Sequence, residues 1–254
     1  MDVDLREATA GDSTDLYYLD MELYDTPEYG AAYILDAERP AVIETGLGTN
    51  TDRILAALEE LGIAPGELAA IAVTHVHLDH AGGAGFLAAA CPNADVVVPD
   101  PGAQFLVDPE PLWEGTKAVI DERIGHYVEP RPVPAERVVG LADGETVELG
   151  DHALTAHAAP GHAFHQAVLY DPANDGAFTG DAAGIEPDGQ LAAYADVLES
   201  WVDSVARVRA REDDDAAVAE YFAERADTVD AWGPVHARDE ERLNVAGVLE
   251  YLDG

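Results

Sequence analysis

Four residues of types that bind metal ions lie within six positions of the chain: His75, His77, Asp79 and His80. In an extended chain, side chains alternate between two sides, so the first three would point the same way and the apolar residues between them would face the core. Imidazole and carboxylate groups are ligands of zinc, iron and manganese, and an open coordination position would bind water. Packing does not account for this density of ligand types, so the sequence predicts a metal centre that activates water.

The same segment resembles a known family signature. Its order, His-x-His-x-Asp-His, is similar to that of the metallo-β-lactamase superfamily, in the glyoxalase II-like branch. Further marks follow in the expected order at Ala159-Pro160-Gly161-His162, Phe178-Thr179-Gly180-Asp181 and Gly233-Pro234-Val235-His236. The resemblance covers most of the chain. It implies an α/β fold, the four-layer αββα sandwich of that family, formed as a single domain over residues 1–254.

The resemblance also implies seven ligands for two divalent metal ions: His75, His77, Asp79, His80, His162, Asp181 and His236. His75, His77 and His162 would hold one ion, and Asp79, His80 and His236 the other. Asp181 would bridge the two ions, and Asp79 and Asp181 would be the catalytic residues. Two metals about 3.5 to 4 Å apart can share a hydroxide, and metal binding lowers the pKa of water towards about 7. Zinc is the expected metal, with iron and manganese as alternatives.

Two positions depart from the family pattern. Glu44, in Ile43-Glu44-Thr45-Gly46, stands where the family generally has Asp, so the acid that would support the metal loop is one methylene longer. Pro234 and Val235 separate Gly233 from His236, which leaves the loss of that ligand as an alternative.

Weaker signals come from the remaining histidines, which are His126, His152, His157 and His165. The last two lie near His162 in the chain and are either outer-sphere, substrate-facing or packing residues, whereas the first two carry no motif and are assigned to structure. Candidates for a substrate wall are the aromatic residues Tyr24, Tyr29, Trp113 and Tyr127, for which core packing is the alternative.

Elements that would position these residues follow from apolar periodicity. Strands are expected over residues 16–23, 31–36, 40–44, 68–74, 95–98, 138–141, 146–149, 153–157, 166–170 and 176–179. Helices are expected over residues 51–61 and 86–90, within 101–130, and over most of the chain from about residue 195. Asn174-Asp175-Gly176 indicates a hairpin turn, because such turns demand positive φ values.

The charge of the chain is strongly negative. Thirteen Lys and Arg face 51 Asp and Glu in 254 residues, a net charge of −38, and Lys117 is the only lysine. At roughly molar salt the Debye length falls to about 3 Å, which screens carboxylate repulsion while net charge favours solubility. The composition therefore indicates a protein of a saline cytoplasm of the halophilic archaeal type, with an acidic protein of ordinary cytosol as the alternative.

The sequence also contains indications of the cellular compartment. The first 20 residues carry acids and no signal-peptide pattern, and no run of about 18 apolar residues could span a bilayer. Cys91 is the only cysteine, so no intrachain disulfide forms. We expect a soluble cytoplasmic protein that acts on a small molecule, without a membrane partner; homodimerisation stays open.

Four functions compete on these observations. Hydrolysis of an ester or thioester, with glyoxalase II-like chemistry, leads. Phosphodiester or RNA cleavage is less favoured, because a −38 chain without a basic strip repels phosphate, so a nucleic-acid partner is not expected. The third function is that of a mono-iron persulfide dioxygenase, and the fourth is that of a regulatory or scaffold protein without catalysis.

The charge generates the first testable prediction. Transfer of the protein from molar potassium chloride to dilute buffer should lower its melting temperature, because the carboxylates are then no longer screened. Thermal denaturation followed by circular dichroism across a salt series measures this. The same melting temperature at both ends of the series would contradict adaptation to high salt.

Overall fold

The computed structural model describes the chain except residues 1–2, 10–12, 121, 183–204, 212–213 and 224–254. The contacts divide the chain into two compact units. The first unit consists of Met1–Ala159 and His165–Gly180, and the second of Pro160–Phe164 and Asp181–Gly254. The prediction of a single domain over the whole chain stays a prediction.

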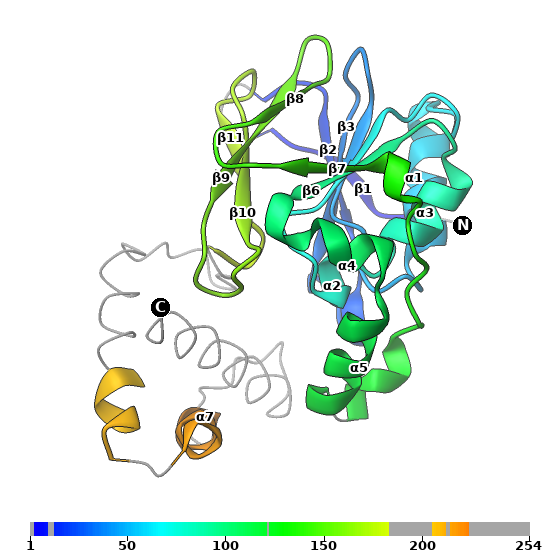
Figure 1. Ribbon diagram of the computed structural model, residues 1–254. Helices are drawn as coiled ribbons and strands as arrows, with labels where there is room; N and C mark the ends of the chain where they lie inside the picture. The colour runs from blue at the N-terminus through cyan, green and yellow to red at the C-terminus, as the bar shows by residue number, and fades with distance from the viewer. Residues whose placement is uncertain (1–2, 10–12, 121, 183–204, 212–213, 224–254) are drawn as a thin grey trace. The chain divides into compact units, whose positions relative to one another are not determined.

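Two β-sheets form the body of the first unit (Figure 1). The larger has seven strands in chain order: β1 (Leu5–Glu7), β2 (Leu16–Asp20), β3 (Ala31–Leu35), β4 (Ala41–Ile43), β5 (Ala70–Ala72), β6 (Asp95–Pro99) and β7 (Val138–Leu141). Its first four strands pair antiparallel and β4 to β7 pair parallel. The smaller is antiparallel in the order β11-β10-β9-β8, from β8 (Thr146–Glu148), β9 (Ala153–Ala158), β10 (Ala167–Asp171) and β11 (Gly176–Phe178).

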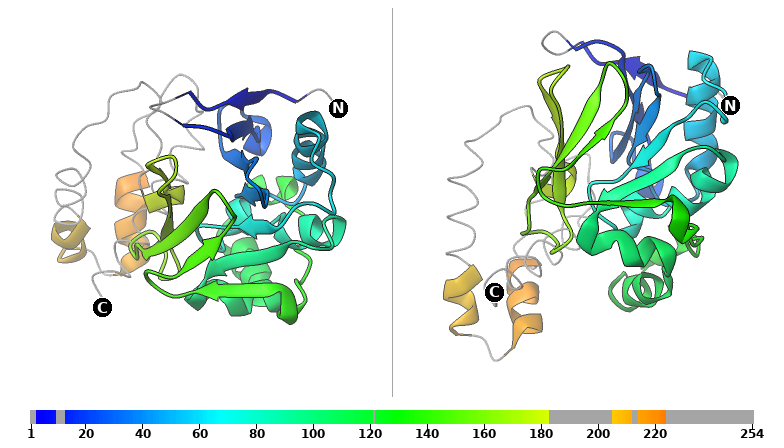
Figure 2. Two further views of the ribbon diagram at one scale, coloured as in Figure 1. Left: turned by 90° about the horizontal axis from the view of Figure 1, so that it is seen from above. Right: turned by 45° about the horizontal axis from the view of Figure 1, so that its top comes forward.

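The main core lies between the two sheets, whose strands run beside each other in Figure 2. It joins residues of both sheets and their connecting loops: Leu35, Ala37, Ala41, Ile43, Ala70, Ala72, Val97, Leu141, Leu149, Leu154, Ala156, Leu169 and Phe178. Side chains alternate along a strand, so the equally buried Ile71, Val96 and Val98 face the opposite side of the larger sheet. The central strands are thus buried on both faces, as parallel strands require.

Helices of the first unit are short. They are α1 (Thr51–Leu61), α2 (Leu78–Ala81), α3 (Ala84–Ala90), α4 (Ala103–Val107) and α5 (Glu110–Val119), with 3₁₀ turns η1 (Leu23–Asp25), η2 (Asp100–Gly102), η3 (Glu122–His126) and η4 (Ala135–Arg137). Helix α3 packs on β5, β6 and α1, and so covers the outer face of the larger sheet. Helix α1 begins and ends where the sequence predicts, and Gly62 stops it at a φ of 78°.

The second unit has a small core of its own. Residues 205–209 are helical, α7 spans Asp215–Ala223, and Val205, Val208 and Val218 bury their side chains together. The described residues after 204 are therefore mainly helical, while a helical region over the whole stretch from about residue 195 stays a prediction. The predicted αββα sandwich includes a second helical layer, which the C-terminal region would supply. Most of that region lies outside the described residues.

The structure confirms the α/β class and most strand positions, with differences at the edges. Strand β1 is a three-residue edge strand with one half-buried and two exposed residues, too short and too polar for an alternation pattern to reveal. The hairpin between β10 and β11 forms where expected, but its positive φ, 45°, falls on Asp175 and not on a glycine. Tyr170 donates a hydrogen bond to the carboxylate of Asp175 at 2.8 Å, which holds the turn.

Gly83 fixes the distance between α3 and the loop after β4. A Cβ on Gly83 would lie 2.4 Å from the carbonyl oxygen of Thr45, whereas a Cβ on Gly115, inside α5, would meet nothing within 4 Å. We expect Gly83→Ala to lower the free energy of unfolding by about 1–3 kcal/mol, the usual effect of overpacking. Gly115→Ala should leave it unchanged or raise it by up to about 1 kcal/mol. Urea unfolding measures both, and equal effects would contradict the close approach.

Candidate metal centre

The four clustered ligand residues follow β5 in the first unit. Their presentation differs from the expected extended chain: the strand ends at Ala72, His77 is the last residue before α2, and Asp79 and His80 lie within that helix. Val76 and Leu78 are buried as expected, but Leu78 is the first residue of helix α2 and not part of an extended chain. Strand-like alternation therefore does not explain why the ligands converge; a strand end followed by one turn of helix does.

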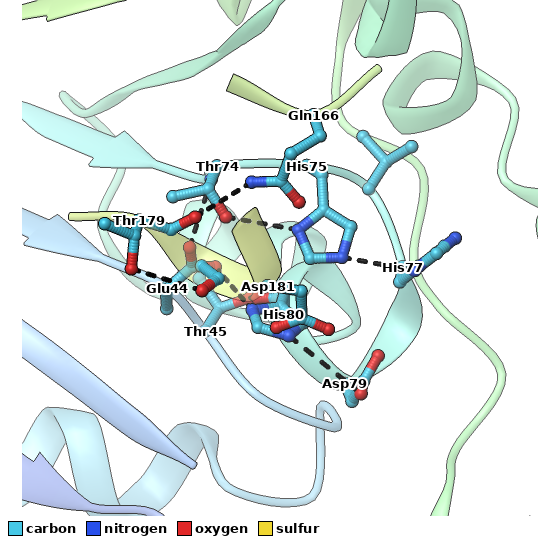
Figure 3. Close-up of polar contacts among 12 residues, drawn as sticks. Glu44, Thr45, Thr74, His75, His77, Asp79, His80, Gln166, Thr179 and Asp181 are labelled. Atoms are coloured by element: carbon cyan, nitrogen blue, oxygen red, sulfur yellow. Dashed lines mark hydrogen bonds and ion pairs between the residues drawn. The ribbon is translucent and has the colours of Figure 1, made fainter. Parts of the chain in front are cut away.

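The imidazole rings of this loop lie close together (Figure 3). Nε2 of His75 lies 3.1 Å from Nδ1 of His77, and the His75 and His80 ring centroids are 4.2 Å apart. His75 is fully buried, and the hydroxyl of Thr74 lies 3.1 Å from its Nδ1. The Asp79 carboxylate, about a quarter exposed, lies 4.0 Å from Nε2 of His80. Three imidazoles and one carboxylate are thus presented by six consecutive residues.

Glu44 supports the loop from the end of β4. Its backbone N–H donates to the carbonyl of Ala72, and its Oε1 accepts the backbone N–H of Thr74 at 3.1 Å (Figure 3). Its Oε2 lies 3.4 Å from Nδ1 of His80. This acid therefore reaches both the strand end and a ring of the cluster, while its own backbone takes a φ of 65°. The longer side chain, in place of the family's Asp, is compatible with the supporting position.

His165 belongs to the same place, although it lies 90 residues further along the chain. It is buried, its Nδ1 accepts the backbone N–H of Val76 at 3.4 Å, and its ring lies 5.3 Å from that of His77 and 6.1 Å from that of His75. The sequence left its role open between outer-sphere, substrate-facing and packing positions. Its position after the Pro-Gly-His segment was the only sequence signal that could have placed it here.

The second unit holds the next two expected ligands. Nε2 of His162 lies 3.3 Å from the Asp181 carboxylate, and the His162 side chain is 8% exposed. Gly180, which precedes Asp181, is part of the first unit and has a φ of 48°; a Cβ on it would lie 2.2 Å from the hydroxyl oxygen of Thr74. Only glycine allows this approach. His236, the last expected ligand, lies outside the described residues.

Three of the four wall candidates form one aromatic cluster. Tyr24 and Tyr29 are buried with ring centroids 5.6 Å apart, and the Tyr24 and Tyr127 hydroxyls are hydrogen-bonded. Burial raises the pKa of Tyr24, and the negative charge of Asp79 raises it further, so its hydroxyl stays protonated. The cluster therefore lies within the electrostatic reach of Asp79. Trp113 is separate, on α5, with the Lys117 ammonium 5.3 Å from its ring.

The remaining histidines lie elsewhere in the first unit. His126 packs edge-on against Tyr24, and His157 is exposed on β9 with its ring 6.4 Å from that of Tyr170. His152 is buried and bonded to Asp171. The assignment of His126 to structure agrees with its aromatic contact, and His157 has no part in the cluster around His75.

The donor set of the loop fits a transition-metal ion. Imidazole nitrogen and carboxylate oxygen are the ligand types of zinc, iron and manganese centres, and a ligand nitrogen of His75 lies within 4.8 Å of one on His77 and of one on His80. Residues 25–220 match the family described as the metallo-beta-lactamase superfamily, more than half of the chain. The chain belongs to this superfamily. Members of this superfamily typically bind one or two divalent metal ions.

Solved structures of this superfamily share the fold. An archaeal superfamily protein from Sulfolobus tokodaii, ST1585, superposes with a TM-score of 0.65 at 19% identity, covering 94% of this chain and 99% of its own. The class B3 di-zinc metallo-beta-lactamase LRA-12, from an Alaskan soil metagenome, gives 0.51 at 16% identity, covering 94% and 89%. At these identities the likeness shows the fold alone.

A curated relative is the acyl-coenzyme A thioesterase MBLAC2 of Gallus gallus. It is 29% identical over 184 residues, which are 65% of this chain and 62% of the relative. The match thus spans about three fifths of that protein's length. Within the described residues, no helix combines the length and apolar character needed to cross a membrane.

The Glu44 contacts generate a stability prediction. Glu44→Ala should leave the buried Thr74 N–H without its acceptor and lower the free energy of unfolding by about 1–3 kcal/mol. Glu44→Gln keeps an acceptor oxygen and should recover most of this loss, while both variants share the strained backbone. Urea unfolding in the presence of a chelator measures the effect of the loop without bound metal. Equal losses in the two variants would show that the hydrogen bond to Thr74 does not stabilise the loop.

Proposed function

We propose that the protein hydrolyses a thioester or ester at a centre of two divalent metal ions, zinc first, with glyoxalase II-like chemistry. The observation that carries the proposal is the convergence of the His75, His77 and His80 rings with the Asp79 carboxylate on one loop at the end of β5. A set of imidazoles with an acid beside it is the donor set of hydrolytic zinc centres.

The proposed ligand set is the one that the sequence implied: His75, His77, Asp79, His80, His162, Asp181 and His236. Chain connectivity supports two of its distant members. Asp181 directly follows Gly180, which touches Thr74, and His162 lies three residues from His165, so at most about 11 Å of extended chain joins it to a residue beside His77. The pair of His162 and Asp181 at 3.3 Å offers a nitrogen and an oxygen together, as one ion requires.

Metal ions supply two effects when bound: they activate water near neutral pH and stabilise negative charge on the substrate oxygen. The protein's own groups supply the rest. Asp79, the carboxylate of the loop, is about a quarter exposed and would accept a proton from the attacking water. Water oxygen bonds to the acyl carbon, the carbon–sulfur bond breaks, and the departing thiolate takes a proton. The products are a carboxylic acid and a thiol.

A substrate class is proposed from the curated relative, the aromatic cluster and the net charge. The likeness to an acyl-coenzyme A thioesterase supports a thioester ahead of other esters. Tyr127, the half-buried member of the aromatic cluster, would offer apolar surface to an acyl group, whereas Tyr24 and Tyr29 are buried behind it as packing residues. A net charge of −38 disfavours nucleic acid as substrate. It also supports a saline cytoplasm as the working environment, where a small-molecule substrate suffers less repulsion.

A ligand variant tests the proposal. His77→Ala should lose bound metal and reduce thioester hydrolysis by more than about 100-fold, because even outer partners of metal ligands contribute about 10- to 100-fold. The variant should remain folded in molar salt, since the cluster lies in a loop beyond β5 and outside the core between the sheets. Elemental analysis, acyl-thioester kinetics and circular dichroism measure the three effects. His157→Ala, an exposed histidine on β9, is the matched control and should change none of them.

Other substrates define the outcomes that overturn the proposal. Metal-dependent cleavage of structured RNA in molar potassium chloride, without thioester hydrolysis, would identify a ribonuclease. One iron per chain with oxygen uptake on a thiol persulfide would identify a dioxygenase. A His77→Ala protein that keeps its metal and full thioester turnover would show that this cluster is not the catalytic metal centre.

A further inference from the structure

A second group of metal-binding side chains lies in the first unit, on segments of the chain other than the loop after β5. Ligand atoms of Asp15, Asp151 and His152 lie within 4.8 Å of one another. Asp15 directly precedes β2 of the larger sheet, and the other two lie in the turn between β8 and β9 of the smaller sheet. None of the three belongs to the ligand set proposed for hydrolysis.

The ring of His152 is held in the way that metal-binding histidines are held. It is 3% exposed, and its Nδ1 lies 2.9 Å from Oδ2 of Asp171, which is itself 1% exposed. A carboxylate at one ring nitrogen fixes the tautomer, since Nδ1–H donates and the lone pair is left on Nε2; carboxylates hold metal-binding histidines in this way. Nδ1 is thus engaged by Asp171, and Nε2 is the nitrogen of His152 that could bind an ion.

Asp171 is itself firmly placed. Its Oδ1 accepts the backbone N–H of Ala173 at 3.1 Å, and its Oδ2 also accepts Nδ2 of Asn174 at 3.0 Å. Asn174 in turn binds the backbone of Thr14. The Thr14 N–H donates to Oδ1 of Asn174 at 2.8 Å, and the Thr14 carbonyl accepts from Nδ2 of Asn174 at 3.2 Å. The residue before Asp15 is therefore tied to the same network that orients His152.

The two carboxylates are also fixed through the backbone. Oδ1 of Asp151 accepts the backbone N–H of Glu38 at 2.8 Å, which holds this carboxylate in place. Asp15 takes a left-handed φ of 57°, rare for a non-glycine residue, and its carbonyl accepts the N–H of Asp36 at 2.8 Å. In a chain of net charge −38, two acids held against each other repel unless a cation lies between them.

We propose that Asp15, Asp151 and Nε2 of His152 bind a divalent transition-metal ion, of the zinc class, that joins the start of β2 to the β8–β9 turn. Two ligand atoms of a tetrahedral zinc ion lie about 3.3–3.6 Å apart, so ligand atoms that now lie within 4.8 Å of one another would close by up to about 1.5 Å, which side-chain rotation supplies. One nitrogen and two oxygens leave a position for water. The ion would link the two sheets and stabilise the first unit.

Zinc titration of the full-length protein tests this proposal independently of any hydrolytic activity. Equilibrium dialysis against buffered free zinc, followed by elemental analysis, gives the number of ions per chain. Asp15→Asn/Asp151→Asn should bind one zinc ion fewer than the wild type. Added zinc should raise its melting temperature by several degrees less than it raises that of the wild type. These substitutions keep side-chain size and leave the His152–Asp171 pair intact.

The matched control is Glu59→Gln/Glu60→Gln, which removes two exposed carboxylates from α1 of the same unit. It should bind as much zinc as the wild type, which separates a built site from general attraction of cations to an acidic surface. Equal zinc content and equal thermal shifts in the Asp15/Asp151 variant and the wild type would overturn the proposal. Should the double variant not fold, Asp15→Asn alone carries the same comparison. Unchanged thioester turnover in either variant would separate this site from the hydrolytic centre.

Discussion

The hydrogen bond from the Thr74 backbone to Glu44 fixes the point at which β5 ends and the ligand-bearing loop begins. The placement of the ligand cluster depends on this point, since His75 follows at once and is fully buried. The same acid reaches His80, so one side chain from β4 positions both ends of the ligand cluster. The parallel pairing of β4 and β5 makes this possible, because it brings the carboxyl ends of both strands to one edge.

Close backbone approaches complete the support of the loop. Gly83 lets α3 touch the carbonyl of Thr45, and Gly180 lets the chain before Asp181 touch Thr74. Any side chain at either position would push apart segments that adjoin proposed ligands. The glycines in these motifs therefore serve packing, which in turn sets where the ligands stand.

Carboxylates and histidines lie together at two places in the first unit. Around His75 a carboxylate accompanies several imidazoles beside an aromatic cluster, an arrangement that suits chemistry on a bound molecule. Near the β8–β9 turn, Asp151 and the buried His152 lie close to Asp15 at the start of β2, an arrangement that suits a structural ion. The strongly negative composition makes cations the natural partners at both places.

The sequence by itself determined the fold class, most strand positions, the full length of α1 and the cluster from His75 to His80, because these depend on local periodicity and on the spacing of ligand types. It misjudged how the loop presents those ligands, since the burial of Leu78 through a helical turn overrides strand alternation. Only the tertiary structure placed His165 beside His77 and oriented His152 against Asp171, because contacts between residues far apart in the chain leave no local pattern to find.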